Sequence, residues 1–143
     1  MKHLSILFLI WISIMLIGCN IRHDNHIIDK IEAEEIANQF YYHLQMEDFK
    51  SAEKLFSEKT FETNTREDLL NYFKATIYTH GNLSNFVLDY WDTSVIDGKD
   101  SKGQYILYYY VTRYPKHTFE KLFLIKENDS IKIIGYEITL ENY

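Results

Sequence analysis

The sequence predicts an α+β domain in which N-terminal helices pack in a curved, cone-like, four-stranded antiparallel meander sheet. Apolar residues recur at helical spacing as far as His80, and after Gly81 they alternate with polar residues while β-branched and aromatic residues become more frequent. The segments between the expected strands are short and rich in turn-forming residues, so neighbouring strands must be antiparallel. An apolar content of 46% is ample for one hydrophobic core.

Three helices are expected in the first half of the chain. The first begins at Asp29, which a Glu follows three residues later as in a capping box, and the second follows Asp48. The third begins at Thr65, where Asp68 completes another capping-box pattern. It ends at Gly81, because a glycine commonly follows the last residue of a helix.

Four strands are expected over residues 85–96, 104–114, 118–126 and 131–140. Both faces of the second strand are aromatic. Its side chains alternate between one face with Tyr105, Leu107, Tyr109, Val111 and Arg113, and the other with Gln104, Ile106, Tyr108, Tyr110, Thr112 and Tyr114. One face must cover the helices, and the other either meets solvent or packs on a partner protein or a second copy of the chain.

The first residues have the pattern of a secretory signal peptide. Lys2 precedes an uncharged apolar run over residues 4–18, which is too short for a permanent membrane span. The run ends in Leu16-Ile17-Gly18-Cys19, which resembles the lipobox that a bacterial lipoprotein signal peptidase reads. Cleavage before Cys19 would free its thiol to carry a diacylglycerol, and acyl chains anchor a protein to a membrane without a span.

This interpretation divides the chain into a signal peptide (1–18), a lipidated tether (19–28) and a cone-like α+β domain (29–143). The tether is polar and aperiodic and would extend up to about 30 Å from the bilayer. His23 and His26 lie in it, and without further ligands nearby in sequence we interpret them as solvated linker residues and expect no metal. The expected location is the cell membrane or outer membrane, after export from the cytoplasm.

Composition and motifs exclude several classes of function. The net charge is −6 and there is no Lys/Arg-rich run, which argues against nucleic-acid binding. A single Cys cannot form a disulfide within the chain. The sequence holds no Ser-His-Asp order, glycine-rich phosphate loop or Cys/His cluster, so no cofactor is expected.

The second half of the chain resembles a known superfamily. It is similar to small bacterial secreted proteins and lipoproteins of unknown function within the nuclear-transport-factor-2-like, or cystatin-like, group. The matching residues are Gly103-Gln104-Tyr105, Tyr108 to Tyr114, Glu120-Lys121-Leu122-Phe123-Leu124, and Ile131-Lys132-Ile133-Ile134-Gly135-Tyr136. The resemblance implies a bent antiparallel sheet that wraps a long helix to form a pocket.

The resemblance also implies where a site would lie. Enzymes of this superfamily place acidic, His or Tyr side chains inside the cone as general acids and bases. The residues that match this role are His43, Tyr105, Tyr109, Glu120 and Tyr136. The simpler interpretation is structural, with Glu120 facing solvent from its strand and His43 hydrogen-bonded on the flank of its helix.

Three functions follow from these observations. The leading hypothesis is a membrane-anchored, non-enzymatic envelope lipoprotein that binds a small apolar ligand or a partner protein through its cone or its sheet. The first alternative is a small-molecule isomerase or dehydratase that uses the cone pocket, which rests on analogy. The second alternative is an immunity-type or partner-type lipoprotein that acts through its Tyr-rich sheet face.

Overall fold

The structure, a computed structural model, describes residues 21–98, 101–127 and 129–140. The residues of the proposed signal peptide and lipobox, Cys19 included, lie outside this range. Over the described residues, no helix is both long and apolar enough to cross a bilayer. The elements, in chain order, are β1 (Ile21–Asp24), α2 (Ile27–Gln45), α3 (Phe49–Glu53), the 3-10 helix η1 (Glu58–Glu62), α4 (Arg66–His80), β2 (Gly81–Asp97), β3 (Lys102–Glu127) and β4 (Ser130–Leu140).

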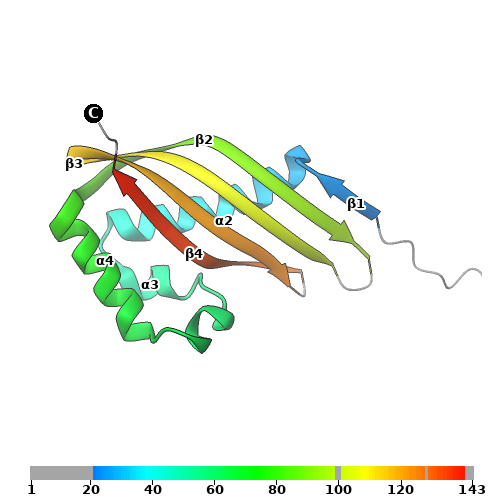
Figure 1. Ribbon diagram of the computed structural model, residues 1–143, viewed down its shortest axis with the longest axis horizontal. Coiled ribbons are helices and arrows are strands. Elements are labelled where there is room, and N and C mark those ends of the chain that lie inside the picture. The colour runs from blue at the N-terminus through cyan, green and yellow to red at the C-terminus, as the bar shows by residue number, and fades with distance from the viewer. Residues whose placement is uncertain (1–20, 99–100, 128, 141–143) are drawn as a thin grey trace, which may run out of the picture.

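The predicted α+β architecture is confirmed. A four-stranded antiparallel sheet has the order β1-β2-β3-β4, and α2, α3 and α4 pack against one side of it (Figure 1). The expected strands over 104–114 and 118–126 form the two halves of the single long element β3. The first half pairs with β2 and the second with β4.

The chain of β3 doubles back on itself at the left of the view (Figure 1). Residues seven apart in a straight strand are separated by about 23 Å, yet Arg113 Nε lies 2.8 Å from Glu120 Oε1. Farther from the bend, the Lys121 ammonium lies 5.2 Å from the centre of the Tyr108 ring. The Pro115-Lys116-His117 separator therefore acts as the turn that the sequence predicts.

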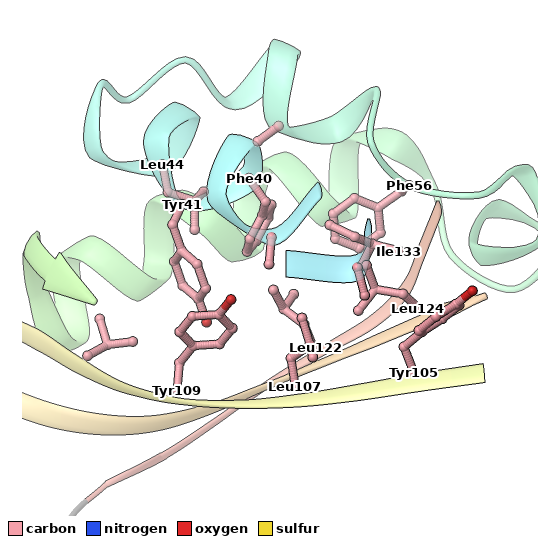
Figure 2. Packing of buried hydrophobic residues seen from close by; sticks show 14 of the residues in the cluster. Phe40, Tyr41, Leu44, Phe56, Tyr105, Leu107, Tyr109, Leu122, Leu124 and Ile133 are labelled. Atoms are coloured by element: carbon pink, nitrogen blue, oxygen red, sulfur yellow. The ribbon is translucent and has the colours of Figure 1, made fainter. Parts of the chain in front are cut away.

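The core lies between α2 and the inner face of the sheet. Along the first half of β3 the odd-numbered residues from Tyr105 to Arg113 are buried, and after the turn the even-numbered residues from Thr118 to Leu124 are buried. Figure 2 shows Phe40 and Tyr41 reaching from α2 towards the strands. Their rings lie 5.0 Å from Tyr136 and 4.7 Å from Tyr109, respectively. Aromatic rings thus fill the space that the curved sheet encloses.

The expected free tether over residues 19–28 is wrong where the structure describes it. Residues 21–24 form strand β1, which pairs antiparallel with the end of β2. Asn25 then exchanges two hydrogen bonds of 2.8 Å with Thr93, through its backbone N–H and its side-chain oxygen. The folded domain thus includes residues 21–28, because the edge of β2 opposite β3 offers backbone groups that this segment covers.

The predicted first residues of α3 and α4 are confirmed, and that of α2 is wrong. Thr65 and Asp68 form the expected capping box of α4, and Asp48 caps α3. Helix α2 begins two residues before Asp29, with His26 as its N-cap. Asp29 does not cap the helix because it is 4% exposed and turned towards the β1 segment.

Candidate functional site

The structure brings together two of the five residues expected to line a pocket. Glu120 and Tyr136 are in contact inside the cone, where the Tyr136 hydroxyl donates a hydrogen bond of 2.5 Å to Glu120 Oε2. Tyr105 and Tyr109 are also buried, at other points along the core. His43 lies away from this cluster on α2, with Nδ1 3.7 Å from Asp48 Oδ2.

The interpretation of Glu120 as a solvated strand residue is wrong. The side chain is fully buried and faces the helices. The turn around Pro115 explains the difference, because its length decides which residues of the second half of β3 share the inner face with Arg113. Since Arg113 is also on that face, the carboxylate of Glu120 meets a guanidinium there instead of water.

A closed network of hydrogen bonds surrounds Glu120. Its Oε1 accepts from Arg113 Nε at 2.8 Å and from Thr118 Oγ1 at 2.7 Å. The Arg113 guanidinium also donates to the Tyr136 hydroxyl at 3.0 Å and, at 3.4 Å, to the carbonyl of Gly81 at the end of α4. A buried charge is tolerated only when it is paired and hydrogen-bonded, and this network meets both conditions.

The surroundings of Tyr136 keep its hydroxyl protonated. Burial raises the pKa of Tyr136 well above its usual value, and the neighbouring Glu120 carboxylate raises it further. Tyr136 therefore stays protonated and acts as a hydrogen-bond donor. Burial also raises the pKa of Tyr72, whose ring lies edge-on to Tyr136 at 6.0 Å. The two phenols near Glu120 therefore act as hydrogen-bond or packing groups in their protonated form.

The space beside this network is too small for a substrate. A recess between α4 and the sheet has a volume of about 10 Å³, roughly the least that one water molecule needs. Its lining is Leu44, Phe49, Phe73, Thr76, Ile77, Arg113 and Tyr136. Paired polar groups do face each other in the cone, as the isomerase or dehydratase alternative requires, but in the part of the chain that the structure describes the recess beside them is too small for a reacting molecule.

Sequence analysis missed Arg113 and Thr118 as members of this network. Arg113 was placed on the same strand face as Tyr105 and Tyr109, and that placement is confirmed. The sequence does contain a signal for the Arg113–Glu120 pair. The two residues lie on either side of the turn at Pro115, and each stands where the alternation of apolar residues in its strand stops. In the antiparallel pair that the sequence predicts for residues 104–114 and 118–126, these two charges lie near each other on either side of the turn.

The opposite face of the sheet carries exposed aromatic side chains. We define the outer aromatic face as Val87, Tyr90, Tyr108, Tyr110 and Phe119, which come from β2 and both halves of β3. Val87 pairs with Tyr110 and Tyr90 with Tyr108 across the β2-β3 ladder. Phe119 meets Tyr110 edge-on at 5.4 Å, so the members form one continuous surface.

Much of this surface is open to solvent in the described structure. Val87 is 54% exposed, Tyr90 55% and Phe119 43%. An exposed apolar residue alone is ordinary, whereas contiguous aromatic groups mark surfaces that bind other molecules. Tyr and Phe rings lose little conformational entropy on binding because they have only two rotatable bonds.

A larger open groove of about 660 Å³ lies at the end of the sheet near β1. Four cationic side chains line it. Three of them have carboxylate partners: Arg22 with Asp24, Lys59 with Glu127, and Lys126 with Glu32. Its charge is therefore largely neutralised, and the groove has no pronounced preference for an anion.

Comparison with known proteins supports the fold alone. No family model matches the chain, and a search of curated proteins finds no significant match. The chain is similar to a crystal structure from Nostoc punctiforme, described as a protein of unknown function with a cystatin-like fold. The two share 20% sequence identity with a TM-score of 0.50, over 81% of this chain and 93% of the other. Three helices packed against a curved antiparallel sheet thus make a cystatin-like fold.

Proposed function

We propose that this protein is an exported bacterial envelope lipoprotein, anchored through Cys19, that binds a partner protein through its outer aromatic face. The observation that carries the binding half is the contrast between the two faces of one sheet. The inner face is filled by aromatic rings and a closed polar network, whereas the outer face exposes a continuous aromatic surface. Binding at the sheet therefore fits the geometry better than binding within the cone.

The lipobox supports the anchor half. Leu16-Ile17-Gly18-Cys19 supplies the small residue and the thiol that lipoprotein processing needs. Ile21, the first residue of β1, follows Cys19 by only two positions. Two residues span about 7 Å at most, so a lipid on Cys19 would hold the domain directly against the membrane surface, with no long tether.

Lipidation is tested by feeding bacteria that express the full chain with an alkyne-tagged fatty acid. We expect the wild-type protein to incorporate the label and to fractionate with membranes. Cys19→Ser removes the thioether-forming atom, so this variant should remain unlabelled and keep its signal peptide. A Cys19→Ser protein that is still processed, acylated and retained in the membrane would contradict the anchor.

Partner binding is tested with a photo-crosslinking amino acid placed in the full chain at Tyr90. The matched control carries the same group at Tyr78, a tyrosine that is 94% exposed on α4 and distant from the outer aromatic face. We expect a crosslinked product from position 90 alone. Once identified, the purified partner should bind the wild type, and a Val87→Ser/Tyr90→Ser variant should bind it at least tenfold more weakly.

The same experiment separates the alternatives. A product at twice the mass of the chain would show that the outer aromatic face joins two copies. Equal crosslinking from positions 90 and 78, or none from either, would refute a specific binding face on the sheet. Retention of partner affinity in the double serine variant would place the interface elsewhere.

A further inference from the structure

The corner where β1 meets α2 gathers polar side chains that the function proposed above does not use. Asn25 has a left-handed backbone conformation (φ 53°), which asparagine tolerates better than most residues. This turn places His23, at the end of β1, beside His26, the N-cap of α2, with ring centres 5.4 Å apart. Asp29 in the first turn of α2 completes the group.

His23 is held between two carboxylates. Its Nε2 lies 3.0 Å from Asp97 Oδ2, and its Nδ1 lies 2.7 Å from Asp29 Oδ2. When Nε2–H donates to Asp97 and the ring is neutral, the lone pair of Nδ1 faces the lone pairs of the Asp29 oxygen. Two such atoms this close repel each other unless a proton or a cation lies between them.

A proton in that position would make an ion pair, and the carboxylates of Asp97 and Asp29 raise the pKa of His23, but the contact does not have the geometry of a hydrogen bond. Neither His23 Nδ1 nor Asp29 Oδ2 has a hydrogen-bond partner of acceptable geometry, although both atoms are buried. Asp29 as a whole is 4% exposed, and a buried carboxylate oxygen without a hydrogen bond is costly. Among the described residues eight buried side-chain atoms lack a partner, and this corner holds four of them, with Thr93 Oγ1 and Tyr105 OH as the others.

A metal ion accepts both lone pairs at once. One ligand atom each from His23, His26 and Asp29 lie within 4.8 Å of one another. Tetrahedral zinc holds its ligands at about 2.0 Å and therefore about 3.3 Å apart. His26 is exposed, so a change of its side-chain rotamer can bring its ring nitrogen closer to the ligand atoms of His23 and Asp29. Two imidazoles and a carboxylate, with a fourth position open to water, form a common zinc ligand set.

We infer that His23, His26 and Asp29 bind one divalent transition-metal ion, with Zn²⁺ the best fit to the ligands. Asp97 orients the His23 ring from its far side, as carboxylates do behind metal-bound histidines. The ion links β1 to the first turn of α2 and so fastens the N-terminal segment to the sheet. The sequence interpretation of the two histidines as solvated linker residues is replaced by this inference.

The test uses the full chain in detergent micelles, purified with an affinity tag that contains no histidine. After the protein is stripped with EDTA, Zn²⁺ is titrated in competition with a chromophoric chelator. His26→Asn is the most informative variant, because asparagine is a good N-cap and removes only the imidazole. Asp29→Asn removes the buried charge with little change of shape. His117→Gln, at the opposite end of the sheet beside Pro115, is the matched control.

We expect one Zn²⁺ per wild-type chain and at least about tenfold weaker binding in His26→Asn and in Asp29→Asn. The His117→Gln variant should bind as the wild type does. Zinc should also slow amide hydrogen exchange in residues 21–24 of the wild type and leave that exchange unchanged in His26→Asn. Wild-type binding no tighter than that of His26→Asn, or an equal loss in His117→Gln, would overturn the site whether or not the Asp29 variant folds.

Discussion

Replacing one member of the buried Arg113–Glu120 pair should destabilise the protein far more than replacing both. Their side chains are 2% and 0% exposed, respectively, and Nε lies 2.8 Å from Oε1. In Glu120→Gln the guanidinium keeps its charge but loses the carboxylate that neutralises it. Removing one partner of a buried ion pair costs about 3–5 kcal/mol. In Arg113→Met/Glu120→Leu no buried charge remains, and such apolar replacements are often neutral or stabilising.

Urea unfolding followed by circular dichroism measures these free energies on residues 20–143 produced as a soluble protein. With a slope of about 2 kcal/mol per molar urea, a loss of about 4 kcal/mol lowers the midpoint by about 2 M. We expect this shift for Glu120→Gln and Arg113→Met, and a midpoint near that of the wild type for the double variant. If each single variant loses under about 1 kcal/mol, or if the losses simply add in the double variant, the pair is not the coupled unit that the structure shows.

Three further changes are measured by the same unfolding assay. Tyr136→Phe removes the hydroxyl that donates to Glu120, so we expect a loss of about 1–3 kcal/mol, and an unchanged midpoint would contradict the network. Gly81→Ala should cost more than 1 kcal/mol, because φ is 93° and an added Cβ would lie 2.0 Å from the Tyr114 carbonyl oxygen; a stabilised variant would refute that strain. Thr65→Ala should cost about 1 kcal/mol through loss of the α4 capping box, whereas Thr65→Ser should restore most of it.

Local signals in the sequence were sufficient for most of the fold. Thr65 with Asp68, Asp48 and Gly81 each mark a helix end through a contact made within a few residues, and such contacts form the same way in many folds. The alternation from Tyr105 onward likewise predicts which residues of β3 share a face, because the period of a strand is a property of its backbone.

The features that sequence analysis missed depend on distant partners. Strand β1 has only four residues, and it is extended because β2 pairs with it from 70 or more positions away. Asp29 resembles a helix cap locally, but His23 draws it into a buried contact instead. Glu120 is polar in an alternating strand, and only the turn at Pro115 brings Arg113 opposite it. In each of these cases the prediction rested on a local preference, whereas the structure is decided by a contact with a residue far away in the sequence.

The same distinction bears on the proposed function. The periodicity of the first half of β3 separates two aromatic faces without saying which one the helices cover. The helices cover the face that ends in Arg113, so the polar network closes the cone and leaves the face with Tyr108 and Tyr110 outward. Burial of Arg113 against Glu120 thus leaves, among the described residues, only a small recess beside the network, and this is why we place the proposed recognition on the outer aromatic face. A variant that opens the cone, such as Tyr136→Ala, should therefore leave partner binding at that face unchanged as long as the sheet remains folded.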